Sequence, residues 1–275
     1  MKLFSNIQAG SRMFVFLTLT LICMPFYTLS RTPGTQRRVA EFWFLAVSRI
    51  VGVNLRAFGQ AHREGPVLYV ANHVSYLDII VLGMCVDAVF VAKQEVADWP
   101  LLGRLARMRQ CIFVTRNATH VRDEVELIRA QLLAGRNIIL FPEGTTGDGG
   151  KLLPFKSSLL AAVDGVAHVW VQPISIAYPD SVQGGTDASL AWYGDMAMLP
   201  HLWSVLQRGH APARLHFHPV LLAREFSDRK SLLNTCRAYI SSGLATLPGP
   251  ASIGQQETNS CAIAGPVHVF GNPSG

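Results

Sequence analysis

Short apolar runs alternate with helical patterns from residue 66 onward, and this alternation restricts the fold more than any other feature of the sequence. The runs have the length of buried strands, and they cover Val67–Ala71, Ala88–Ala92, Cys111–Thr115, Asn137–Phe141, Val169–Ala177 and Arg214–Val220. Helical spacing separates them, at Leu77–Cys85, Thr119–Ala134, Phe155–Val163 and Ser227–Leu244. Such alternation predicts an α/β fold, with a mixed, mostly parallel sheet flanked by helices.

The N-terminal segment combines an apolar run with basic flanks. Met13–Ser30 has 18 residues without a charge, between Arg12 and Arg31, and about 20 apolar residues span a bilayer. A cleaved signal peptide and a buried core helix are alternatives, but no small-residue cleavage site follows the run. We expect a membrane anchor, followed at Val39–Val53 by an amphipathic helix that lies either in the membrane interface or against the rest of the protein.

Basic side chains are concentrated at the N-terminus. The chain is 49% apolar and only 15% charged, and residues 1–63 hold eight basic side chains against one acidic side chain. A basic region attracts either nucleic acid or an anionic membrane. Because the arginines are interleaved with apolar stretches, we expect a membrane and no nucleic acid as partner. The five cysteines are scattered without CxxC spacing, so no metal site is predicted.

These patterns divide the chain into three parts. Residues 1–63 are expected to form a membrane anchor and a basic amphipathic helical region, and residues 64–247 the α/β domain. Residues 248–275 are rich in Gly, Pro, Ser, Gln and Asn, which is typical of a disordered tail. Within the α/β domain, Trp192–His201 is expected to line the functional site or the membrane edge.

A histidine and an aspartate stand at the end of one predicted strand. Asn72 and His73 follow Val67–Ala71, and Asp78 lies in the helix predicted next. A histidine there can act as a general base if a carboxylate fixes its tautomer. Five residues apart in a regular helix, the side chains would diverge by about 140°, so they meet only if His73 lies in the turn before the helix. The alternative is a capping Asn72 beside an ordinary surface histidine.

A glycine-rich loop follows another predicted strand. It contains Glu143, Gly144, Thr145 and Thr146, and its backbone N–H groups can approach an oxygen-rich head group closely. Glu143 can accept hydrogen bonds from hydroxyl or amine groups of an acceptor. Lys156 adds a cation near a predicted helix start, which suits an anion. The alternative is a surface turn without a ligand.

Two single residues complete the set of candidates. Arg116 follows Cys111–Thr115, and its planar guanidinium suits phosphate or carboxylate. Alone, such an arginine is usually a solvated surface group. Pro173 interrupts Val169–Ala177, which by itself indicates an edge strand or a bulge.

Together these residues resemble the four sequence blocks of the lysophospholipid and 1-acylglycerol-3-phosphate acyltransferase family. The blocks lie between residues 60 and 220, as His73 with Asp78, Ile112-Phe113 with Arg116, Phe141-Pro142-Glu143-Gly144, and Val171-x-Pro173. The resemblance implies an O-acyltransferase domain in which His73 is the base and Asp78 its partner. It implies substrate binding by Asn72, Arg116, Glu143, Gly144, Thr145, Thr146, Lys156 and Pro173, the last on the acyl-donor side. The implied co-substrate is an acyl carrier protein or coenzyme A thioester, without a cofactor or metal.

Two departures from the commonest family pattern bear on the acceptor. Gln110 stands where many phosphatidate-forming members have Gly, and Thr146 where they have an Arg expected to hold the acceptor phosphate. The stretches Glu143–Gly149 and Trp192–Met196 are similar to the branch that acylates lyso-ornithine lipid in bacteria. We therefore expect a lysolipid acceptor, favouring lyso-ornithine lipid, at the cytoplasmic face of the bacterial inner membrane. The alternatives are synthesis of phosphatidic acid from 1-acylglycerol-3-phosphate, an acyl thioesterase, and a catalytically silent lipid-binding protein.

Overall fold

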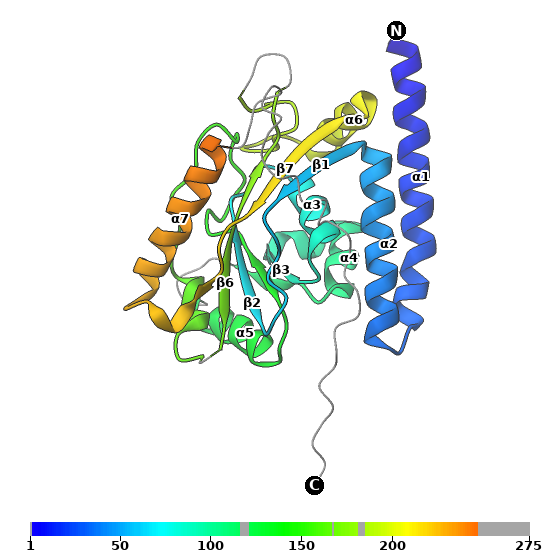
Figure 1. Ribbon diagram of the computed structural model, residues 1–275. Helices are drawn as coiled ribbons and strands as arrows, with labels where there is room; N and C mark the ends of the chain where they lie inside the picture. Colours follow the sequence, from blue (N-terminus) through cyan, green and yellow to red (C-terminus); the bar gives the residue numbers. More distant parts are fainter. Residues whose placement is uncertain (1, 116–120, 167, 181–184, 247–275) are drawn as a thin grey trace.

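An eight-stranded sheet forms the centre of the protein (Figure 1). The computed structural model describes residues 2–115, 121–166, 168–180 and 185–246. The strands are β1 Val53–Phe58, β2 Val67–Ala71, β3 Val89–Lys93, β4 Ile112–Val114, β5 Ile138–Leu140, β6 Trp170–Ala177, β7 Ala211–Phe217 and β8 Leu221–Leu222. They are arranged in the order β1-β7-β6-β2-β5-β3-β4, and β8 pairs with β6.

Most strand pairs are parallel. The central strand β2 is parallel to β5 on one side and to β6 on the other, whereas β6 is antiparallel to β7 and β8. The residues of β2 are all buried, as expected for a parallel strand that is covered on both faces. The predicted fold class, a mixed and mostly parallel sheet with flanking helices, is therefore confirmed.

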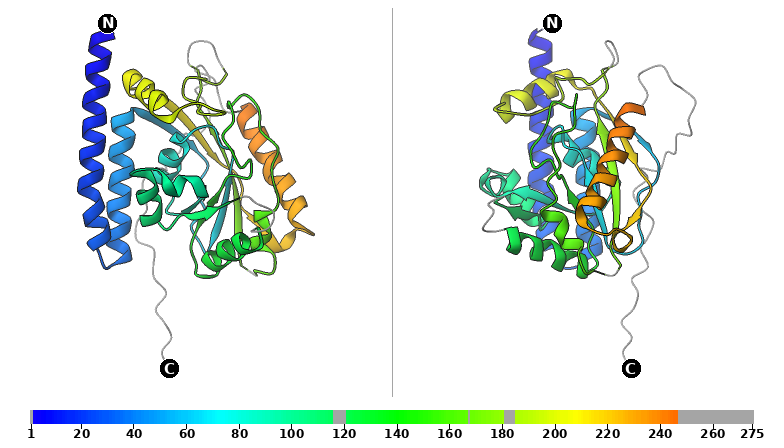
Figure 2. Two further views of the ribbon diagram at one scale, coloured as in Figure 1. Left: turned by 180° about the vertical axis from the view of Figure 1, so that it is seen from behind. Right: turned by 90° about the vertical axis from the view of Figure 1, so that its left-hand side faces the viewer.

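Helices cover both faces of the sheet (Figures 1 and 2). The α-helices are α1 Lys2–Leu29, α2 Pro33–Val51, α3 Leu77–Cys85, α4 Leu102–Met108, α5 Val121–Leu133, α6 Met198–Arg208 and α7 Arg229–Thr246. Short 3₁₀ helices are η1 Gln94–Asp98, η2 Leu159–Val163 and η3 Ala223–Glu225. One apolar core lies under α2, α3 and α6, and a second core lies on the other face under α5, η2 and α7.

The two N-terminal helices form an antiparallel hairpin along one side of the molecule (Figure 1). The Trp43 indole N–H donates a hydrogen bond to the Thr20 hydroxyl at 3.0 Å. The Arg12 guanidinium donates to the Leu206 carbonyl at 2.6 Å, which attaches α1 to the last turn of α6. The stretch Leu3–Leu29 is long and apolar enough to cross a membrane. Only 11% of its apolar 18-residue segment is buried in the protein, so most of this apolar surface is exposed.

The first strand of the sheet and one predicted helix differ from the sequence prediction. Strand β1 was not predicted, because it lies at the sheet edge, half-exposed, and pairs only with β7. The sheet therefore begins before the expected domain boundary at residue 64. The predicted helix Phe155–Val163 is reduced to the 3₁₀ helix η2, which begins only at Leu159. Before it, the Lys156 backbone N–H donates to the Pro142 carbonyl at 2.9 Å.

Pro173 was predicted to mark an edge strand or a bulge, and the edge strand is wrong, because β6 is paired on both sides. The Pro173 carbonyl accepts the His218 N–H at 3.0 Å, on the edge of β6 that faces β7 and β8. There β6 pairs with β8 up to Val171 and with β7 from Ile174 onward. Pro173 stands between these two pairings, where the sheet ladder needs no backbone N–H.

Candidate functional site

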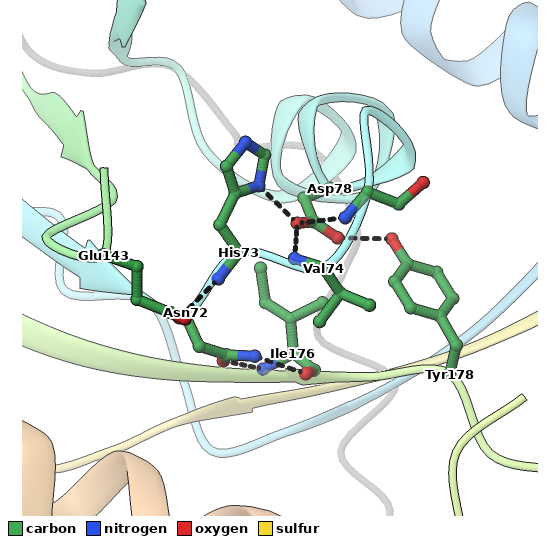
Figure 3. A network of polar contacts seen from close by, with 8 residues as sticks. Asn72, His73, Val74, Asp78, Glu143, Ile176 and Tyr178 are labelled. Carbon is green, nitrogen blue, oxygen red and sulfur yellow. Dashed lines mark hydrogen bonds and ion pairs between the residues drawn. The ribbon is translucent and has the colours of Figure 1, made fainter. Parts of the chain in front are cut away.

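His73 and Asp78 meet at the carboxyl end of β2. Strand β2 ends at Ala71 and α3 begins at Leu77, so His73 lies in the connecting turn and Asp78 in the first turn of the helix. The His73 Nδ1 and the Asp78 Oδ2 are 2.7 Å apart (Figure 3). The Asp78 side chain is fully buried, while 18% of the His73 side chain is exposed. This is the geometry that the strand-turn-helix interpretation requires.

The carboxylate determines which ring nitrogen of His73 is free. An ionised carboxylate only accepts hydrogen bonds, so Nδ1 carries the hydrogen and Nε2 presents a lone pair when the ring is neutral. Figure 3 shows Nε2 on the side of the ring that points away from Asp78. Phe141 stacks on the imidazole, with ring centroids 3.9 Å apart and planes 12° from parallel. The ring is therefore fixed in both tautomer and orientation.

Asp78 is itself fixed by three further donors. Its Oδ2 accepts the backbone N–H groups of Val74 at 2.7 Å and Ser75 at 3.1 Å. Its Oδ1 accepts the hydroxyl of Tyr178 at 2.7 Å. Since hydrogen bonds occupy both carboxylate oxygens, the group cannot rotate away from His73 without breaking several of them.

Asn72 and Glu143 were expected to bind substrate, and in the structure both side chains are buried and hydrogen-bonded to backbone groups. The Asn72 amide donates to the Ile176 carbonyl at 2.9 Å and accepts the Ile176 N–H at 2.8 Å. The Glu143 Oε1 accepts the His73 N–H at 2.9 Å, and its Oε2 accepts the Leu153 N–H at 3.0 Å. Asn72 thus joins the end of β2 to β6, and Glu143 joins the backbone of His73 to that of Leu153.

The environment of Glu143 favours its neutral form. Burial raises the pKa of Glu143 from 4.5 to about 7, although the hydrogen bonds from His73 and Leu153 lower it. The negative charge of Asp78 raises the pKa further. With this raised pKa, Glu143 binds a proton at a higher pH than an ordinary carboxyl group does.

The glycine-rich loop lies directly against the turn between β2 and α3 that carries His73. The Gly147 N–H donates to the His73 carbonyl at 2.8 Å. Gly144 has a φ of 74°, a left-handed conformation that glycine adopts without strain. Thr145 is exposed and Thr146 is half-buried, one residue before the direct contact with His73.

The remaining predicted residues are placed as follows. Lys156 is exposed, and its backbone N–H binds Pro142 beside the glycine-rich loop. Pro173 is buried in register with Val70, inside the sheet. Arg116 lies outside the described residues, as does the predicted tail 248–275.

Several aromatic residues at the site were not predicted individually. Tyr178 and Phe141 contact the Asp78–His73 pair from distant parts of the sequence. Trp192 was expected at the site within the range Trp192–His201, and its backbone N–H donates to the Val74 carbonyl at 3.0 Å. The indole of Trp192 packs edge-on against Tyr76, with ring centroids 6.0 Å apart. Tyr178 reaches Asp78 because it follows the end of β6, and no short sequence pattern predicts that position.

Comparison with known proteins agrees with this geometry. The sequence model of the acyltransferase family matches residues 53–177. A lyso-ornithine lipid O-acyltransferase of Brucella abortus is 37% identical over 84% of this chain and 92% of its own. A 1-acyl-sn-glycerol-3-phosphate acyltransferase of Neisseria meningitidis is 33% identical over 66% of this chain and 70% of its own.

A solved structure shows the same fold. The crystal structure of the 1-acyl-sn-glycerophosphate acyltransferase PlsC from Thermotoga maritima superposes with a TM-score of 0.68 at 19% identity. The match covers 92% of this chain and 98% of that chain. Since the sequence relatives extend over most of the chain and the fold agrees, the protein is an acyltransferase and belongs to the acyltransferase family.

Proposed function

We propose that this enzyme transfers a fatty acyl chain from a thioester to the free hydroxyl of a lysolipid, with His73 as general base. The observation that carries the proposal is the His73–Asp78 pair, in which Nδ1 is bound to the carboxylate and Nε2 is turned away from it. In that arrangement Nε2 can take the proton of the acceptor hydroxyl as its oxygen attacks the thioester carbonyl.

The reaction balances without a covalent enzyme intermediate. The acceptor oxygen forms the new ester bond, and the carbon–sulfur bond of the donor breaks. The proton taken up by Nε2 then passes to the departing thiolate, which leaves as a thiol. Asp78 stabilises the imidazolium between these two steps. The donor is an acyl carrier protein or coenzyme A thioester, and the residues require no cofactor.

The test of the base is His73→Ala, assayed with purified enzyme, labelled acyl donor and lysolipid. General-base catalysis contributes roughly 10²–10⁴-fold, so we expect at least about a hundredfold loss of kcat/KM with an unchanged unfolding transition. His210→Ala, at an exposed histidine before β7, is the matched control and should retain activity. Full activity in His73→Ala would refute the mechanism. Release of free fatty acid at a rate independent of lysolipid would instead identify a thioesterase.

We propose lyso-ornithine lipid as the favoured acceptor, giving ornithine lipid. The Brucella relative carries that name, and Thr146 provides no cation beside the catalytic turn. The alternative acceptor is 1-acylglycerol-3-phosphate, as named for the Neisseria relative, and the exposed Lys156 favours it.

Competition between the two acceptors tests this proposal. Both lipids are offered to the enzyme together, and the products are separated by chromatography. Thr146→Arg should raise the use of 1-acylglycerol-3-phosphate relative to lyso-ornithine lipid by about tenfold, because a guanidinium binds phosphate through charge-assisted hydrogen bonds. Thr145→Arg, at the exposed neighbouring position, is the control for added charge alone. An unchanged acceptor ratio in Thr146→Arg would remove the argument from head-group charge.

We further propose that the enzyme lies on the cytoplasmic face of the bacterial inner membrane, attached through α1. The apolar exposed surface of α1 and the arginines of its flank and of α2 support this placement, since cytoplasmic flanks of membrane segments carry an excess of basic residues.

A further inference from the structure

Tyr178 is a buried phenol that none of the family-like sequence blocks includes. It follows β6 directly, and its side chain is inaccessible to solvent. Its hydroxyl lies 2.7 Å from the Asp78 Oδ1, on the side of the carboxylate opposite the imidazole (Figure 3). Among the described residues it is the only donor to that oxygen, whereas Oδ2 accepts from His73, Val74 and Ser75.

The backbone on both sides of Tyr178 is fixed. Asn72 clamps Ile176 through two hydrogen bonds, and the Tyr178 carbonyl accepts the Asp187 N–H at 2.7 Å. Burial and the charge of Asp78 raise the pKa of Tyr178 well above its ordinary value, so the phenol keeps its proton. The hydroxyl is therefore a permanent donor that cannot turn to another partner.

We propose that Tyr178 is a positioning residue of the acyl transfer, which sets the basicity of His73 through Asp78 without touching substrate. A hydrogen bond to one carboxylate oxygen withdraws negative charge from the other oxygen. The Tyr178 hydroxyl thus limits how strongly Asp78 stabilises the imidazolium form of His73. This inference rests on the proposed role of His73 as base.

Tyr178→Phe removes the hydroxyl and leaves the ring. We expect the acid limb of the kcat/KM profile to move to higher pH by roughly one unit, while KM for donor and acceptor changes less than about twofold because no substrate contact is lost. Tyr69→Phe is the matched control, since Tyr69 is equally buried and its hydroxyl donates to the His62 carbonyl at 2.6 Å, away from the pair. That variant should leave the acid limb in place.

A change of opposite sign excludes a merely structural effect. Replacing Tyr178 with 3-fluorotyrosine makes the phenol a stronger donor, so the acid limb should move to lower pH. An NMR titration of the labelled His73 imidazole in detergent should follow the same order of midpoints, without any assay of turnover.

An acid limb that stays unmoved in Tyr178→Phe, or that moves equally in Tyr69→Phe, would overturn the inference. So would a fluorotyrosine shift in the same direction as the phenylalanine shift. These outcomes leave the proposed function intact if His73→Ala is still inactive, whereas an active His73→Ala would remove both.

Discussion

The backbone of His73 is held by hydrogen bonds with two residues of the glycine-rich loop. Glu143 accepts the backbone N–H of His73, and the carbonyl of His73 accepts the N–H of Gly147. The backbone of His73 is thus attached to the glycine-rich loop at both of its polar groups. A charge within this attachment costs free energy because it is buried, and that cost depends on pH.

Glu143→Gln should therefore change how stability depends on pH. The pKa of Glu143 is about 7 in the folded protein against 4.5 as the ordinary value, so the folded state binds the proton more tightly. Stability is highest below the lower value and falls as pH rises through this window, by up to about 3 kcal/mol. The glutamine variant, which does not titrate, should lose that decline in chemical unfolding curves measured from pH 4.5 to 8.

The slope, rather than the absolute stability, is the quantity to compare. Glutamine accepts only one of the two backbone N–H groups well, so a constant loss at all pH values is expected as well. Glu64→Gln, at an exposed carboxylate, should keep the slope of the wild-type protein. If stability depended on pH in Glu143→Gln as it does in the wild-type protein, the raised pKa of Glu143 in the folded state would be contradicted.

The pairing of His73 with Asp78 could be predicted from the sequence, but the residues that hold this pair could not. His73 and Asp78 are close in the chain, so the turn that joins them could be predicted from the strand before it and the helix after it. Tyr178 is 100 residues from Asp78, and its contact exists only because β6 pairs with β2. The two hydrogen bonds of Asn72 to Ile176 also depend on that pairing, so they could not be predicted from the sequence around Asn72.

At the scale of elements, burial decided which predictions succeeded. Strand β2 and helix α3 match their predicted ranges, because β2 is wholly buried, α3 is largely buried, and both have continuous apolar runs. The edge strand β1 is half-exposed and contains Arg56, and its only neighbour β7 comes more than 150 residues later in the chain. Local periodicity cannot carry such a pairing, so the fold class could be predicted while the sheet edge could not.

The contact between α2 and α3 provides a prediction at this scale. A Cβ on Gly83 would lie 2.5 Å from the buried ring of Phe44. Overpacking costs about 1–3 kcal/mol, whereas alanine gains up to about 1 kcal/mol over glycine in a helix. Gly83→Ala should therefore lower the free energy of unfolding, and Phe44→Leu in the same chain should recover part of the loss.

A second glycine in the same pair of helices is the control. Gly34, near the start of α2, has no atom within 4 Å of an added Cβ, so Gly34→Ala should be neutral or slightly stabilising in the same denaturant titration. If Gly83→Ala were equally neutral, the close packing of α2 on α3 at Gly83 would not contribute to the free energy of unfolding.

At the scale of the whole molecule, α1 presents one apolar face to solvent and the other to the protein. At 28 residues it is about 42 Å long, more than the roughly 30 Å of the hydrocarbon core. It packs on α6 near its start and on α2 further along. Its exposed apolar side chains are Leu3, Phe4, Ile7, Phe14, Val15, Leu17, Leu21, Ile22, Phe26 and Leu29.

This packing favours an α1 that enters the membrane lengthwise, by its exposed face. A helix standing across the bilayer would take α2 with it, and α2 carries Arg37, Arg38 and Arg49. Arginine at the bilayer centre is costly. Embedded by one face, α1 keeps those arginines at the level of the lipid head groups, where they attract anionic lipid.

Leu21→Asp places a charge in the apolar face of α1. It should therefore weaken binding to vesicles that contain anionic lipid by at least about tenfold, as measured by flotation. The leucine is 64% exposed, so the fold and the activity toward detergent-dispersed lysolipid should persist. Leu133→Asp is the matched control: Leu133 is 67% exposed on α5, on the opposite face of the sheet. Equal losses in the two variants would show that general surface hydrophobicity, rather than the α1 face, binds the membrane.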